Sequence, residues 1–323
     1  MSAADPTAHA GSRPPGRVTG CAWCGAAFDG REMRLGGRVR CPRCGAATTD
    51  PWPSAQDLAD AYGTWYRPRT GRRFSLVGDA LLARTRGALA ARVDAIAPPG
   101  PVLDVGAGDG TLMDALRRRG REVTGLERDP ERADMRDEPL SRVQGAWAAI
   151  VFWHALEHLP DPGDAIRDAA RLLLPGGVVV IAVPDTSSLQ ARAFGDDWLH
   201  LDLPRHLVHL PAATLRAGLE GAGLRVERES HVRGGQIVVG WLDGLVGRLP
   251  GDLDLYQALR RPDARSRAAS TARRLGAIAA GVALLPVAAI CAALEVALGR
   301  SGTVYVEARR PRRPRRMTGR SSA

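Results

Sequence analysis

The chain has 323 residues, of which 45% are apolar and 25% are charged. These values are typical of a globular protein and exclude a largely disordered one, and the length allows one α/β domain with a smaller module. The formal net charge is +10, and every cationic side chain is arginine.

The N-terminal third carries four of the five cysteines. Residues 1–19 have no apolar run, so they are not a secretory signal, and we expect a disordered leader. The cysteines follow as two C-x2-C pairs, Cys21/Cys24 and Cys41/Cys44. Four thiolates around one Zn²⁺ make a closed tetrahedral site with no place for substrate. The spacing predicts a structural zinc ribbon over residues 20–50, in preference to a disulfide framework or a set of redox-active thiols.

Residues 51–98 read as a helical connector. The segment begins with prolines, and Ser75 to Ile96 then carries apolar residues at the three- and four-residue spacing of a helix. Two prolines in "APPG" end this helix.

A strand, a glycine-rich turn, a helix and a second strand follow. Val102 to Val105 reads as a short buried strand, Thr111 to Arg119 as a helix, and "EVTGLE" as a strand that ends on Glu127. The turn between the first strand and the helix contains Gly106, Gly108 and Gly110. Such a turn lets backbone N–H groups approach a ligand, and an acid about 20 residues further on can accept both hydroxyls of a ribose.

The stretch "WHALEHLPDP" contains His-x-x-Glu-His, a pattern that some zinc proteases use on a helix. Here it directly follows the apolar strand Ala148 to Trp153, and Pro160 leaves little room for a helix. We therefore expect the motif at the carboxyl end of a sheet strand, where open α/β proteins bind ligands. A helix at "DPGDAIRDAARLLL" and a buried strand at "VVVIAVP" continue the alternation that implies a parallel sheet.

The motifs "VLDVGAGDG", "GLE", "FWHALEHLPDP" and "LLLPGGVVVIAVP" resemble those of class I S-adenosylmethionine-dependent methyltransferases. The similarity is to a branch with an N-terminal zinc ribbon, and it extends over about residues 20–310. It implies a doubly wound, Rossmann-like, mostly parallel sheet with an antiparallel last strand, over core residues 99–235 and 301–309. The implied cofactor-binding residues are Asp104, Gly106, Ala107, Gly108, Glu127, Trp153 and His154.

The resemblance also gives these residues roles. Asp104 would face the methionine amino group, Glu127 the ribose hydroxyls, and Trp153 and His154 the methyl group. One departure is that "RDPERADMRDEPLSRVQG" is short for a helix, a third strand and a loop, which puts the adenine site in doubt.

A methyl transfer to oxygen or nitrogen needs a base near the acceptor, and five histidines are candidates. We rank His154 and His206 as near equals, because His154 ends a strand and His206 lies in "DLPRHLVHL", which resembles a segment over the acceptor pocket. The other candidates are His158, His200 and His209. Glu157 is expected to be a structural partner of the loop or of Arg205 rather than a base.

The apolar segment Leu275 to Leu294 has no charged residue and lies in a helical insertion over 236–300. A single membrane crossing would place "GTVYVEA" on the opposite side of the membrane from the rest of its sheet. The alternatives are a shallow helical hairpin bent at Pro286 on an anionic membrane surface, or a soluble helix that covers the sheet. The arginine-rich residues 310–323 read as a solvated tail.

The sequence thus predicts a cytoplasmic methyltransferase that uses S-adenosylmethionine and a structural Zn²⁺, peripheral to the inner membrane face. Its acceptor would be a small molecule, a sugar or a lipid-linked glycan. A zinc-ribbon protein that binds or modifies nucleic acid is the alternative, but only 7 Trp, 4 Tyr and 4 Phe are available to stack bases. A scaffold without activity is a third, and the oligomeric state stays open.

Overall fold

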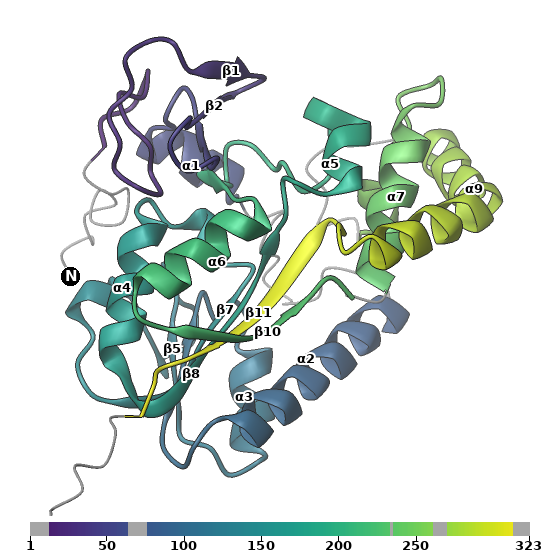
Figure 1. The fold of residues 1–323 in the computed structure, drawn as a ribbon. Helices are drawn as coiled ribbons and strands as arrows, with labels where there is room; N and C mark the ends of the chain where they lie inside the picture. Colours follow the sequence, from purple (N-terminus) through teal and green to yellow (C-terminus); the bar gives the residue numbers. More distant parts are fainter. Residues whose placement is uncertain (1–12, 64–75, 233–234, 261–269, 313–323) are drawn as a thin grey trace, which may run out of the picture.

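A computed structural model of the chain describes residues 13–63, 76–232, 235–260 and 270–312 (Figure 1). Its centre is a seven-stranded sheet in the order β10-β11-β8-β7-β4-β5-β6. Strand β11 pairs antiparallel with both of its neighbours, and the other described pairs are parallel. The mostly parallel sheet with an antiparallel last strand is therefore confirmed. The strands are β4 (Val102–Val105), β5 (Val123–Leu126), β6 (Met135–Arg136), β7 (Trp147–Trp153), β8 (Leu173–Pro184), β10 (Arg225–Ser230) and β11 (Thr303–Arg309).

The strand order reverses between β4 and β7. From β4 the chain adds β5 and β6 on one side, and then returns to add β7 and β8 on the other side. The loops that follow β4 and β7 therefore lead to opposite halves of the sheet, and we call the carboxyl ends of these two strands, where both loops begin, the crevice. In open α/β sheets this is the place where ligands bind.

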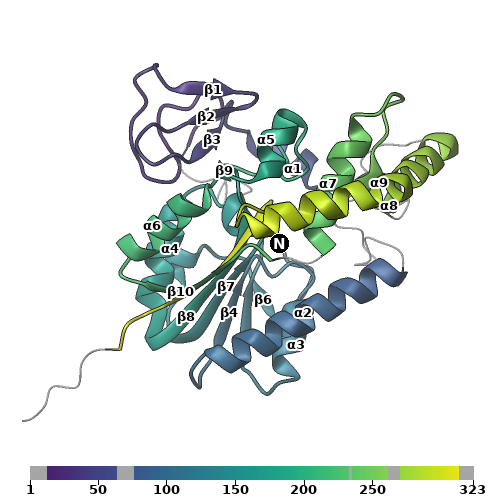
Figure 2. The same cartoon turned by 45° about the vertical axis from the view of Figure 1, so that its right-hand side comes forward.

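Helices cover both faces of the sheet, which explains why its central strands β7 and β8 are apolar throughout. Helices α2 (Leu76–Ile96) and α3 (Thr111–Arg117) lie on one face, and α4 (Pro162–Leu172) and α6 (Ala212–Gly221) lie on the other (Figures 1 and 2). Successive residues of a strand serve opposite faces. Ile150 packs in the cluster with α4 and α6, and Val151 packs in the cluster with α2 and α3.

The region of the third strand is reduced but present. Strand β6 consists of two residues and pairs in parallel with β5. Between β5 and β6 the chain forms only a loop, so the segment that we noted as short for a helix, a strand and a loop keeps a short strand there. Strand β8 also differs from expectation, because it begins at Leu173, inside the segment expected to be helical, rather than at Val178.

The cysteine-containing module is a small sheet of its own, in the order β1-β2-β3-β9. Strands β1 (Met33–Leu35), β2 (Arg38–Arg40) and β3 (Ala47–Thr49) come from the predicted ribbon, and β9 (Val208–His209) comes from the core. The expected leader is shorter than 19 residues. Gly16 exchanges backbone hydrogen bonds with Trp52, and Val18 N donates to the Asp50 carboxylate; residues 1–12 lie outside the described part of the chain.

The connector and the insertion are helical, as expected. Helix α1 (Ala55–Ala61) begins at Ser54, whose side chain accepts from Asp57 N in a capping box. The insertion contains α7 (Gly235–Gly247), α8 (Leu255–Leu259) and α9 (Thr271–Ala297). With α5 (Leu189–Phe194) these three helices form a separate apolar cluster, which we call the helical lobe.

The shape expected for the apolar segment was wrong. Helix α9 is continuous over 27 residues and has Pro286 in its interior, so there is no hairpin. It packs against α7 and α8 rather than over the sheet. After α9 the chain returns directly to the sheet as β11. The Arg310 guanidinium still bonds the Arg171 carbonyl, so the tail begins later than residue 310, and 313–323 lie outside the described residues.

Candidate functional site

The turn after β4 exposes its backbone. Gly106 has φ +74°, and its N–H and that of Ala107 both donate to the Leu126 carbonyl, at 2.8 and 3.0 Å. A Cβ on Gly106 would lie 2.5 Å from the Cβ of Ala155, so only glycine fits against the loop after β7. A Cβ on Gly108 would meet no atom within 4 Å. Gly108 therefore borders open space, in which a ligand can contact the backbone.

Glu127 follows β5 and lies against this turn. Its Oε2 accepts a hydrogen bond from Gly108 N at 2.5 Å, and its Oε1 accepts one from Arg128 N at 2.9 Å. The backbone thus holds the carboxylate beside the glycine turn. This is the position from which an acid can accept hydrogen bonds from the hydroxyls of a ribose.

Asp104 lies in β4, one strand from Glu127, and is 2% exposed. Its Oδ2 has no hydrogen-bond partner in the described part of the chain. Burial raises the pKa of Asp104 to about 7, against an ordinary 3.8. A cationic ligand beside such a buried carboxyl would stabilise its ionised form.

Trp153 and His154 end strand β7 on the opposite side of the crevice. The Trp153 ring packs between the guanidinium of Arg86, at 5.1 Å, and the ring of Tyr305, at 6.5 Å. His154 has φ +53°, a conformation that turns its side chain out of the strand. Its Nδ1 lies 3.4 Å from Glu157 Oε1, and its Nε2 lies 3.3 Å from Gln236 Nε2 of α7.

Glu157 is the centre of a histidine cluster. Its side chain is buried, and Nε2 of His206 lies 4.0 Å from Oε1. Burial alone would raise its pKa, but the contact with His154 and the charges of the nearby imidazoles lower it to about 2. Ligand atoms of Glu157, His158 and His206 lie within 4.8 Å of one another, so this group has the spacing of a metal site as well as that of an acid–base cluster.

Burial makes three histidines of this cluster less basic than an exposed histidine. It lowers the pKa of His158 to about 4, and that of His200 and His209 to about 3. Imidazoles with such values are weak bases at neutral pH. His206 Nδ1 donates to the His200 carbonyl at 2.9 Å, and this bond fixes the ring. Carboxylates lie near both of the remaining candidates: Glu157 is 3.4 Å from His154 Nδ1, and Asp202 is 3.7 Å from His206 Nε2.

The expected partner of Glu157 was wrong. Arg205 pairs with Asp202 through Nε and Nη2, and its Nη1 donates to the Ala61 carbonyl. Glu157 instead faces His154 and His206. Arg205 therefore ties the "DLPRHLVHL" segment to the end of α1.

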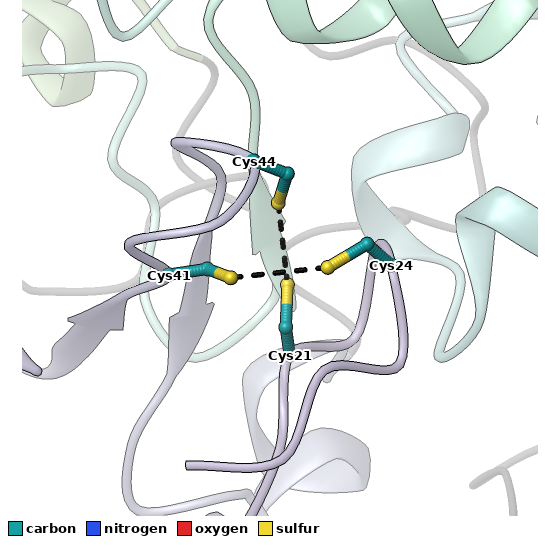
Figure 3. Close-up of side chains that lie close together, drawn as sticks. All are labelled: Cys21, Cys24, Cys41 and Cys44. Carbon is teal, nitrogen blue, oxygen red and sulfur yellow. Dashed lines mark hydrogen bonds between the residues drawn. The ribbon is translucent and has the colours of Figure 1, made fainter. Parts of the chain in front are cut away.

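The four ribbon cysteines converge on one point (Figure 3). The Sγ atoms of Cys21 and Cys44 lie 3.7 Å apart, and those of Cys24 and Cys41 lie 3.8 Å apart. A tetrahedral Zn²⁺ with metal–sulfur bonds of about 2.3 Å requires sulfur–sulfur distances of about 3.8 Å. The residues present fit a closed Zn²⁺ site, and this site is separate from the crevice of the sheet.

The ribbon supports the segment that carries His206. Strand β3 pairs with β9, and Thr49 Oγ1 donates to the His206 carbonyl at 2.6 Å. Thr214 Oγ1 of α6 donates to the Cys44 carbonyl, also at 2.6 Å. The ribbon thus holds in place the segment that carries His206.

Three residues near the site were not singled out from the sequence. The Tyr62 hydroxyl lies 2.8 Å from His158 Nδ1, Gln236 contacts His154, and Asp202 lies 3.7 Å from His206 Nε2. Tyr62 and Gln236 come from the connector and the insertion, which carry no motif. The i, i+4 spacing of Asp202 and His206 was the only signal in the sequence.

Comparison with known proteins gives the family of the core. Residues 79–229 match a family model described as a methyltransferase domain, and this range includes the glycine turn, Glu127 and the histidine cluster. These residues belong to the class I S-adenosylmethionine-dependent methyltransferase family. The family match does not include the ribbon or helices α7, α8 and α9 of the helical lobe.

Similar proteins include two bacterial relatives named ubiquinone biosynthesis O-methyltransferase. The one from Xanthomonas oryzae pv. oryzae (strain PXO99A) is 29% identical over 150 residues, which are 39% of this chain and 63% of the relative. The one from Xylella fastidiosa (strain 9a5c) is 30% identical over 156 residues, 41% of this chain and 63% of the relative. The chain therefore spans less than two thirds of the length of these relatives. The solved structure of the cyclase SpnF has a TM-score of 0.48 at 19% identity, covering 80% of this chain and 97% of that one.

Proposed function

We propose that the protein transfers the methyl group of S-adenosylmethionine to a hydroxyl oxygen of a small molecule. The observation that carries this proposal is the set of residues at the carboxyl ends of β4, β5 and β7. The glycine turn and Glu127 follow β4 and β5, and His154 follows β7 with Glu157 beside its ring. The relatives named O-methyltransferases support oxygen as the acceptor atom.

The cofactor would be held by the residues around the glycine turn. Glu127 would accept from the ribose hydroxyls, Asp104 would pair with the methionine ammonium, and Trp153 would line the pocket beside the methyl group. The backbone of Gly108 would pack against the cofactor, because its Cβ position is open. When bound, the cofactor supplies an electrophilic methyl group.

His154 would be the base that prepares the acceptor. Glu157 lies 3.4 Å from Nδ1, which keeps the proton of the neutral ring on that nitrogen and leaves the lone pair on Nε2. The acceptor hydroxyl would give its proton to Nε2 as its oxygen bonds the methyl carbon and the bond from that carbon to the sulfonium sulfur breaks. Glu157 would stabilise the imidazolium that results. The Gln236 amide nitrogen lies 3.3 Å from the same Nε2 in the structure and would give way there to the acceptor hydroxyl. His206 would be a second polar residue beside the acceptor, and the ribbon would hold it in position.

The four cysteines would bind a structural Zn²⁺. The two pairs lie at the spacing of a tetrahedral site, and no open coordination position remains for a substrate. We further propose that the protein works in the cytoplasm, because a tetrathiolate site persists in a reducing compartment. Nucleic acid is not among the partners that this site would need.

The decisive experiment is calorimetric titration with S-adenosylmethionine and S-adenosylhomocysteine. Both should bind, and Glu127→Ala should weaken binding by about tenfold to a hundredfold, because a carboxylate that accepts hydroxyl hydrogen bonds is lost. Glu131→Ala is the matched control, since this acid lies close by in the chain and is exposed. Absence of binding to the folded, zinc-loaded protein would contradict the proposal.

A further inference from the structure

Helix α9 packs into the lobe through small residues and turns its large apolar residues outward. Its buried positions are Ala277, Gly281, Ala288, Ala292 and Glu295. We call its exposed positions the outer face; they are Leu275, Val282, Leu285, Val287, Ile290, Leu294 and Leu298. A surface helix of a soluble protein shows the opposite pattern, with polar residues outside. Small residues at helix contacts with large apolar residues outside are typical of helices surrounded by lipid.

Polar contacts fix the rotation of α9, so the outer face cannot turn inward. The buried Glu295 carboxylate accepts from Gln190 N at 2.8 Å, from Gln190 Nε2 at 2.9 Å and from Trp241 Nε1 at 3.0 Å. A Cβ on Gly281 would lie 3.1 Å from Leu255. Rotation of the helix would leave a buried carboxylate without partners and would force larger side chains against α7 and α8.

The charges at the ends of α9 are arginines. Arg273 and Arg274 precede the apolar segment and Arg300 follows it, and residues 275–294 contain no charged side chain. Cationic ends around an apolar middle complement a bilayer with anionic headgroups, because the apolar face enters the acyl boundary while the guanidiniums stay at headgroup level. The net charge of +10 also favours binding to an anionic membrane surface.

The connection to the sheet determines how such a helix would lie. Strand β11 begins at Thr303, six residues after α9 ends, and pairs with β8 along seven residues. A helix that crossed the bilayer would place β11 on the far side from its own sheet. Figures 1 and 2 show α9 on the outer side of the lobe, remote from the ribbon. We propose that the outer face of α9 is a membrane-docking surface, with the helix in the plane of an anionic bilayer.

Vesicle flotation of the full-length, zinc-loaded protein tests this proposal. We expect it to float with vesicles that contain phosphatidylglycerol and to bind phosphatidylcholine vesicles several-fold less. The double variant Val282→Glu and Ile290→Glu should reduce flotation at least about tenfold, because two apolar side chains are lost from the contact. These side chains are 70% and 62% exposed, so the variant should keep its melting temperature and its zinc.

The matched control is Met33→Glu, which makes a similar change at a residue that is 57% exposed on the ribbon, and it should float like the wild type. Three results would overturn the proposal. The first is no flotation of the wild type with either vesicle. The second is equal loss of flotation in Met33→Glu. The third is a wild-type dimer in sedimentation velocity that the double variant converts to a monomer without any vesicle binding, since the outer face would then contact a second copy.

Discussion

Asp104 is expected to couple cofactor binding to the release of a proton. Its pKa of about 7 means that the apo protein holds a proton below this pH, whereas the unfolded chain loses it near 3.8. The contribution to folding stability is therefore present at low pH and is lost as pH rises from about 4 to about 7. A methionine ammonium beside the carboxyl would favour the ionised form, so binding at about pH 6.5 should release a proton.

This coupling is measured as the dependence of the calorimetric binding enthalpy on buffer. Phosphate and Tris differ in their ionisation enthalpy, and the two titrations should differ in proportion to the protons released. Asp104→Asn keeps the shape of the side chain, should abolish the difference, and should weaken binding by about tenfold or more. Identical enthalpies in the two buffers for the wild type would show that Asp104 does not meet the ammonium.

His154 and His206 can be separated by their effects on turnover. His154→Ala should lower the rate of methyl transfer by about 10²- to 10⁴-fold, as for loss of a general base, and should leave cofactor affinity unchanged. Glu157→Gln should cost less, because the amide can still hold the ring. His206→Ala should cost least. Rates would be measured with a hydroxylated acceptor identified by screening, and a larger effect at His206 than at His154 would reverse the assignment.

Sequence patterns indicate how the residues proposed to bind the cofactor are arranged, but not the contacts on the proposed acceptor side, for a physical reason. Asp104, Gly106 and Glu127 come from one strand–turn–helix–strand unit, whose spacing is set by local geometry. The acceptor side joins His154 to Gln236 and His206 to Thr49, and these contacts link elements more than 80 residues apart. A single sequence carries no signal for such contacts, which is why His154 and His206 could not be ranked.

At the scale of elements, the docking of the ribbon on the core depends on two glycines. A Cβ on Gly163, at the start of α4, would lie 2.2 Å from the Trp23 carbonyl, and a Cβ on Gly218 of α6 would lie 2.3 Å from the Trp23 ring. Gly163→Ala should therefore destabilise the protein by about 1–3 kcal/mol through overpacking against backbone. Gly221→Ala, in the same helix as Gly218, has no atom within 4 Å of its Cβ and should cost nothing.

Thermal unfolding followed by tryptophan fluorescence checks this expectation, since Trp23 is buried at the contact. A melting temperature of Gly163→Ala equal to that of Gly221→Ala would show that the ribbon does not pack on α4 as described. The pairing of β3 with β9 was not foreseen, because β9 is two residues long and has no pattern of its own. The continuous α9 was missed because a proline in a helix interior usually kinks or ends it.

At the scale of the whole molecule, the ribbon and the methyltransferase core are parts of one site. The core holds the proposed cofactor-binding residues on β4 and β5, and the ribbon supports the proposed acceptor-side residue His206 by pairing β3 with β9. The helical lobe reaches the same point through Gln236. Loss of the metal should consequently affect methyl transfer more than it affects cofactor binding.

Removal of zinc should abolish methyl transfer while cofactor binding persists. Without a metal, the four thiols cannot hold the ribbon, and β9 loses its only partner among the described strands. Amide hydrogen exchange should then lose protection at residues 206–209, whereas 102–127 should stay protected and cofactor affinity should remain within about threefold. Cys24→Ser should reproduce this result, and Cys291→Ser, outside the cluster on α9, should not. If the metal-free protein keeps protection at 206–209, or loses cofactor binding together with transfer, the ribbon does not support the acceptor side selectively.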